Sequence, residues 1–315
     1  MRPSLKTRQA WFDRGAQAFA AACPTVVRDH FPHDVGPLYV CPLCVARNGF
    51  KAFLRQAVET KQLTAEHVPP ESAGGRALLL TCAECNHRAG TQLDAHAHVA
   101  HRLEPNAAGV IERPVRVTFD SRAINMTISA DATGVRLFGD PPRNAPENHL
   151  RFFDAVDQVA RTGSLNWRFG VDFHRDRFDP QRAATSYLRA GYLAAFAKFG
   201  YRLILNAAFN IVRAKIEDPG ALEPPLYAIR IPHADESART IVIIESPQEL
   251  ASGLAIQMGR HLVLLPGPGD MTFYQRVAGR TGDAVQLTGQ VVPWPTHPEF
   301  LFDRVTEHQS TGVER

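Results

Sequence analysis

Apolar and polar positions follow two periods along this chain, and together they predict a mixture of helices and strands. Apolar residues recur at helical spacing over 7–23 and over 180–199. Asp179 and Pro180 strengthen the start of the second helix as an N-cap and a first-turn proline. Small or apolar residues fill every fourth position of that helix, so we predict that it lies in a core. Further helices are predicted at 50–59, from 86 onward, at 147–161 and at 207–217.

Alternation with a period of two predicts the strands. The strand at 62–68 should end at Pro69, because proline has no N–H to donate to a sheet. Proline, glycine and a loss of periodicity at 103–114 predict a domain boundary. The mixture predicts an α+β fold, with an N-terminal helix and connector at 1–37, a small domain at 38–104 and a larger one at 115–305. Strands are predicted at 38–40, 62–68, 77–81, 115–119, 124–129, 135–138, 165–174, 240–245, 262–265 and 284–292.

Composition and charge narrow the class of protein without identifying it. Hydrophobic residues make up 44% and charged residues 21%, which is typical of a globular protein. The net charge of +3 lies entirely in residues 1–110, which contain 12 Lys/Arg and 9 Asp/Glu. By itself this charge is too small to indicate a nucleic-acid partner. No run approaches the roughly 18 apolar residues of a membrane span, and the start lacks an uninterrupted apolar signal core. We therefore expect no membrane association and a cytoplasmic location.

Four of the five cysteines form two C-x-x-C pairs, Cys41 with Cys44 and Cys82 with Cys85. In a reducing compartment such pairs indicate a metal site rather than disulfides. Four thiolates around Zn2+ make a closed tetrahedral site with a structural role. The 37 residues between the pairs exceed the roughly 15–20 of a simple zinc ribbon. The extra length leaves room for an inserted strand and loop. Cys23 is expected to be a small buried side chain.

The combined pattern resembles the HNH (ββα-metal) nuclease family, in its branch with zinc-binding cysteine pairs. This resemblance covers about residues 38–100. It implies a β-hairpin leading into a helix, with one catalytic divalent cation, Mg2+ or Mn2+, between them. We therefore expect a small zinc-stapled ββα-metal domain beside a larger mixed α+β domain. The matching residues are Cys41-x-x-Cys44, Glu66-His67-Val68-Pro69, Gly74-Gly75, Cys82-x-x-Cys85-Asn86, Ala89-Gly90 and Asp94.

The resemblance also implies roles for particular residues. His67 matches the histidine that activates water, and an imidazole suits this task because its pKa lies near neutrality. Glu66 and Asn86 match ligands of the catalytic cation, and Asp94 is either a further ligand or a group that orients one. Oxygen ligands suit a hard cation that stabilises a leaving oxygen. The implied activity is hydrolysis of phosphodiester bonds, with double-stranded DNA as the expected partner.

One position departs from the family's pattern. The family usually has an asparagine five residues before the second cysteine pair, where it orients the histidine, and Ala77 stands there instead. His67 is then oriented by other groups, or the site is degraded. Arg76 and Arg88 are candidates for phosphate contacts, although scattered surface arginines are common.

Two other interpretations stay open. A non-catalytic zinc module that binds nucleic acid or protein would explain Ala77. The second alternative is a nuclease that acts on RNA, because the motif contacts phosphate rather than base. A single site cleaves one strand, so double-strand cleavage would require a homodimer or repeated nicking. The role of residues 115–305 cannot be derived from the sequence.

Overall fold

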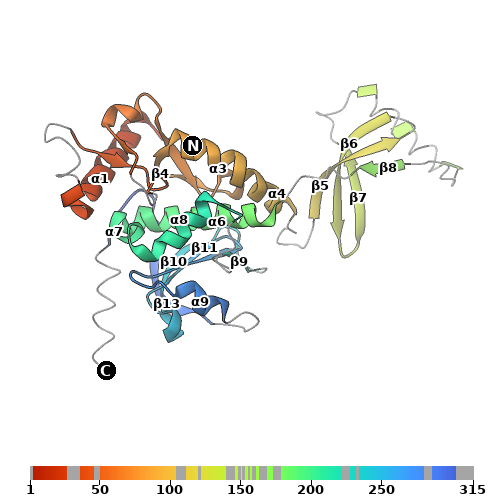
Figure 1. Cartoon of the computed structure of the whole chain (residues 1–315). Coiled ribbons are helices and arrows are strands. Elements are labelled where there is room, and N and C mark those ends of the chain that lie inside the picture. Colours follow the sequence, from red (N-terminus) through yellow and green to blue (C-terminus); the bar gives the residue numbers. More distant parts are fainter. Residues whose placement is uncertain are drawn as a thin grey trace. The chain divides into compact units, whose positions relative to one another are not determined.

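The computed structural model mixes helices with antiparallel strands, which confirms the α+β class (Figure 1). The chain divides into two compact units, one comprising residues 1–97 and 179–315 and the other residues 98–178. None of the helices in the described part of the chain is long and apolar enough to cross a membrane. The structure describes residues 3–26, 36–45, 50–103, 111–119, 122–139, 146–147, 150, 153–154, 157, 161–162, 169–172, 179–220, 228–231, 234–279 and 286–302.

The N-terminal part of the first unit contains a long helix, two small antiparallel strand pairs and a helical segment. The helix predicted over 50–59 is wrong, because Ala52 and Phe53 pair with β1 and only a single 3-10 turn follows. The elements are α1 (Leu5–Ala22), β1 (Tyr39–Val40), β2 (Ala52–Phe53), a 3-10 turn (Arg55–Val58), β3 (Leu63–Val68), a 3-10 turn (Glu71–Ala73), β4 (Arg76–Cys82), α3 (Ala83–Ala89), a π-helical stretch (Gly90–Asp94) and α4 (Ala95–Leu103).

The C-terminal part of the same unit places helices against a five-stranded antiparallel sheet, in the order β13-β10-β11-β12-β9. The predicted core helix is confirmed as α6, with Asp179 as its N-cap. The elements are α6 (Pro180–Phe199), α7 (Tyr201–Ile204), a 3-10 turn (Ala207–Phe209), α8 (Asn210–Glu217), β9 (Ala228–Arg230), β10 (Arg239–Ser246), a 3-10 turn (Gln248–Leu250), β11 (Leu254–Met258), β12 (His261–Leu265), α9 (Phe273–Ala278) and β13 (Thr288–Pro293).

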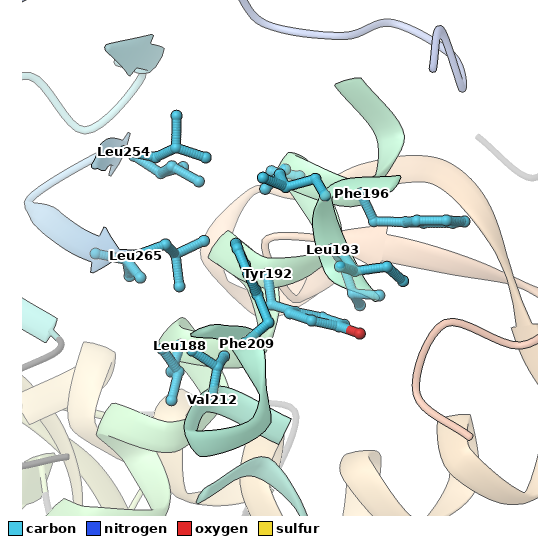
Figure 2. Packing of buried hydrophobic residues seen from close by; sticks show 14 of the residues in the cluster. Leu188, Tyr192, Leu193, Phe196, Phe209, Val212, Leu254 and Leu265 are labelled. Atoms are coloured by element: carbon cyan, nitrogen blue, oxygen red, sulfur yellow. The ribbon is translucent and has the colours of Figure 1, made fainter. Parts of the chain in front are cut away.

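Helix α6 lies between the β3–β4 hairpin and the five-stranded sheet and is buried on all sides beyond its first turn (Figure 1). One hydrophobic cluster joins its side chains to Val68, Leu78 and Leu79 of the hairpin and to the sheet. Figure 2 shows part of this cluster, in which Leu254 and Leu265 of the sheet accompany residues of α6 and α8. The hairpin and the C-terminal half therefore share one core. This differs from the expected separation of 38–104 from 115–305.

The second unit contains a four-stranded antiparallel sheet in the order β7-β6-β5-β8. Its small core consists of Val115, Val117, Ile124 and Met126. The strands predicted at 115–119, 124–129 and 135–138 are confirmed, whereas most of the helix predicted at 147–161 lies outside the described residues. The strands are β5 (Ile111–Phe119), β6 (Arg122–Asp131), β7 (Gly134–Gly139) and β8 (Phe169–Asp172), of which β8 is the described part of the strand predicted at 165–174.

The N-cap of α6 provides a first testable prediction. The Asp179 carboxylate accepts hydrogen bonds from the N–H groups of Gln181 and Arg182, at 2.9 and 3.2 Å. Asp179→Ala leaves both donors without this acceptor, so it should lower the free energy of unfolding by about 1 kcal/mol. Asp179→Asn keeps an acceptor and is the matched control in denaturant unfolding. An equal loss in both variants would show that the charge, and not the cap, stabilises the helix.

Candidate metal centre and nuclease site

The two cysteine pairs meet in space. Their four Sγ atoms lie within 4.8 Å of one another, and Cys44 Sγ is 3.5 Å from Cys82 Sγ and 3.4 Å from Cys85 Sγ. Tetrahedral zinc with Zn–S bonds of about 2.3 Å separates its sulfurs by about 3.8 Å, so the cluster fits this ion. Among the described residues it is the one group of three or more His, Cys, Asp or Glu side chains placed to hold a metal ion.

Local backbone structure aims these sulfurs at a common point. The first pair is bent by a turn in which the Cys44 N–H donates to the Cys41 carbonyl at 3.0 Å. In the second pair Cys82 is the N-cap of α3, and the Cys85 N–H donates to its sulfur at 3.5 Å. Burial raises the pKa of Cys41, whereas hydrogen bonds from Cys41 and its neighbours lower the pKa of Cys82. A bound cation is what allows all four thiols to lose their protons.

Three buried tyrosines tie the cysteine cluster to the rest of the first unit. Burial raises the pKa of each, so the hydroxyls remain donors. Two of them come from α6 and α7, which couples the first cysteine pair to the C-terminal half of the chain. The hydroxyl of Tyr39 donates to Leu80 O at 2.6 Å, that of Tyr192 to Pro42 O at 2.8 Å and that of Tyr201 to Val40 O at 2.5 Å.

His67 lies near the end of β3, at an irregular point of the hairpin. The register shifts between Glu66, which is opposite Leu79, and His67, which is opposite Ala77. Leu78 is therefore the extra residue of a β-bulge, a feature that is frequent beside active sites. His67 is half-buried, and the hydrogen bonds found among the described residues do not include its ring. Ala77, which stands at the family's usual asparagine position, thus faces His67 without a polar group to orient it.

Glu66 points the other way, into the core, and binds Arg189 of α6. Its carboxylate is 3% exposed and lies 2.5 Å from Nη2 of Arg189, whose side chain is 1% exposed. The Thr81 hydroxyl donates to the second carboxylate oxygen at 2.9 Å. Both oxygens of the expected metal ligand are therefore engaged by protein groups.

Asp94 binds the same guanidinium from the other side. Nη1 of Arg189 lies 3.2 Å and 3.3 Å from the two carboxylate oxygens of Asp94, and the Ser186 hydroxyl donates to one of them at 2.6 Å. Asp94 is the last residue of the π-helical stretch between α3 and α4. Such stretches in otherwise α-helical segments are common at functional sites. The structure thus brings Glu66 and Asp94 to one place, with an arginine between them.

The other predicted site residues lie on the hairpin and α3. The Asn86 amide donates to Thr64 Oγ1 at 3.0 Å and to Ala65 O at 3.3 Å, which fixes α3 against β3. Arg76 starts β4 and Arg88 lies on α3, and both are exposed. Their accessibility agrees with a role in phosphate binding, which stays a prediction.

Sequence reasoning missed Arg189, Ser186 and Thr81. The useful signal was a charged residue inside a helix predicted to be buried, because a buried arginine requires partners of opposite charge. Nothing in the sequence indicates that those partners are Glu66 and Asp94, which lie 123 and 95 residues away.

Comparison with known proteins identifies one segment of the chain. Residues 55–100 match the family model of an HNH endonuclease. This range contains the β3–β4 hairpin, the second cysteine pair and α3, and it starts after the first pair. Neither the curated proteins nor the solved structures gave a match. The match covers a minor part of the chain.

Proposed function

We propose that the HNH endonuclease-like segment at 55–100 hydrolyses phosphodiester bonds of nucleic acid, with DNA as the substrate. The observation that carries this proposal is the family match on a hairpin and helix, β3, β4 and α3, of the expected order. A zinc ion on the four cysteines would supply only a rigid frame, because four thiolates leave no open position for substrate.

His67 is the proposed base. Its ring is partly accessible, and a neutral imidazole can take a proton from water near pH 7. The resulting hydroxide attacks phosphorus, the bond from phosphorus to the leaving oxygen breaks, and that oxygen takes a proton from solvent water. Exposed Arg76 and Arg88 would hold the phosphate backbone, a contact that makes binding weaker as salt rises.

A catalytic Mg2+ or Mn2+ at Glu66, Asn86 and Asp94 does not fit these residues as folded. Both carboxylates are occupied by Arg189 and by hydroxyl donors, and Glu66 is closed to solvent. The proposed reaction therefore assigns no step to an ion at this pair.

Supercoiled-plasmid nicking tests the proposal. The zinc-loaded full chain should convert the plasmid to open circles, in parallel reactions with Mg2+, with Mn2+ and with EDTA. His67→Ala should lower the rate by about 10²- to 10⁴-fold, because it removes the general base. His87→Ala, at an exposed position of α3, is the matched control and should nick at the wild-type rate. Equal nicking by His67→Ala would remove His67 from the mechanism. A linear product would indicate cleavage of both strands, either by two sites acting together, as in a homodimer, or by repeated nicking.

A second candidate function is a non-catalytic zinc module that binds nucleic acid. Ala77 opposite His67 and the arginine between the two carboxylates favour it. This candidate predicts binding that survives His67→Ala and no turnover of any substrate. Parallel assays with RNA and single-stranded DNA separate it from a nuclease that prefers another nucleic acid.

A further inference from the structure

Arg189 forms a buried bridge between the two carboxylates that the family resemblance assigns to a metal ion. One guanidinium nitrogen binds Glu66 and the other binds Asp94. Arg189 and Ser186 lie one turn apart on α6, and both reach Asp94. The bridge therefore joins the nuclease-like hairpin, the helical segment after it and the central helix of the core.

A divalent ion cannot share this position with the guanidinium. Mg2+ requires near-octahedral oxygen ligands and normally keeps several waters, whereas Glu66 and Arg189 are nearly closed to solvent. An ion bound to either carboxylate would also lie a few ångströms from a fixed positive charge. Burial alone would lower the pKa of Arg189, but the charges of Glu66 and Asp94 outweigh it and raise that pKa, so the guanidinium stays charged.

We infer that Arg189 takes the place of the catalytic cation in this chain, so that Glu66 and Asp94 form a guanidinium site and not a divalent-metal site. The arginine supplies the positive charge that keeps buried Glu66 and partly buried Asp94 together, and their side chains are 4% and 20% exposed. The inference starts from the cation that the family resemblance implies at these carboxylates. It concerns the ligand of one pair of carboxylates and does not require the protein to be a nuclease.

Manganese titration of the zinc-loaded full chain, followed by the electron paramagnetic resonance signal of free Mn2+, tests this inference. Wild type should show no stoichiometric Mn2+ site that depends on Asp94. Arg189→Met removes the charge but keeps a long apolar side chain, and it should gain one Mn2+ per chain. That gain should disappear in the double variant Arg189→Met with Asp94→Asn. Arg260→Met is the matched control, because Arg260 is also buried and pairs with Glu236 elsewhere in the unit, and it should gain nothing.

Two results would overturn the inference. One is a wild-type protein that binds one Mn2+ and loses it in Asp94→Asn. The other is a folded Arg189→Met protein, verified by circular dichroism, that binds no Mn2+. If Arg189→Met does not fold, the comparison of wild type with Asp94→Asn decides the question by itself. The titration uses no substrate, so its result does not depend on whether the protein nicks DNA. A titration that overturned the inference would likewise leave the His67 nicking assay valid as a separate test.

Discussion

Replacing Cys41 and Cys44 together by serine is expected to abolish zinc binding and to unfold the β3–β4 region of the first unit. Structural zinc contributes roughly 10–16 kcal/mol in small zinc modules, which is comparable to the roughly 5–15 kcal/mol that stabilises a whole domain. Here Cys41, Cys82 and Cys85 belong to a hydrophobic cluster that includes residues of α1 and the hairpin, and Cys44 packs against it. Even a loss of about 5 kcal/mol would lower the melting temperature by about 10–20 °C for a unit of this size.

Native mass spectrometry and thermal unfolding measure the two parts of this prediction. Wild type should contain one zinc ion per chain, and the double variant none. Cys23→Ser is the control, because Cys23 is outside both pairs and only partly buried, so it should keep its zinc and melt close to wild type. A double variant that retained one zinc per chain would assign the ion to other ligands.

Elements with strong local signals could be predicted from the sequence. The Asp179-Pro180 start located α6, alternation located β3, and the spacing of the cysteines indicated a metal site that the structure assembles. The helix predicted at 50–59 was wrong, because pairing with β1 overrides the local helical pattern of this interval. Pairing of that kind depends on residues outside the interval, here Tyr39 and Val40, which the periodicity of the interval itself does not report.

The division of the chain could not be predicted for a related reason. The first unit is discontinuous, since residues from 179 onward return to pack on residues 1–97. The proline and glycine at 103–114 lie beyond the boundary of that unit, which falls between residues 97 and 98, and no pattern marks the return of the chain at 179. The hydrophobic cluster of α6 includes residues of both the hairpin and the sheet, and only the folded chain shows this.

The candidate site shows the same limit. Neighbouring residues of a strand point to opposite faces, and buried Glu66 beside half-buried His67 agrees with this rule. The partner of Glu66 is Arg189 of α6, which lies 123 residues later in the chain. The family resemblance assigned a role to Glu66 from its position in the motif, whereas the role supported by the structure comes from Arg189.

Glu66→Ala is expected to destabilise the first unit by about 3–5 kcal/mol, because it leaves the buried guanidinium of Arg189 with one partner fewer. Asp94 still offsets part of the charge of Arg189, so the loss of stability should lie near the lower end of this range. Glu66→Gln keeps an acceptor for Thr81 and should cost less. The exposed pair Lys51–Glu84 is the comparison, and breaking it by Glu84→Ala should cost no more than about 1 kcal/mol.

A double-mutant cycle in denaturant unfolding isolates the Glu66–Arg189 interaction. The double variant Glu66→Gln with Arg189→Met removes both charges, so its loss should be smaller than the sum of the single losses. Additive losses would mean that the two side chains do not interact in solution. The cycle also decides how activity data are interpreted. If Glu66→Ala abolishes nicking while its unit is unfolded, the loss reports the buried ion pair, and only variants shown to be folded can assign Glu66 a part in the chemistry.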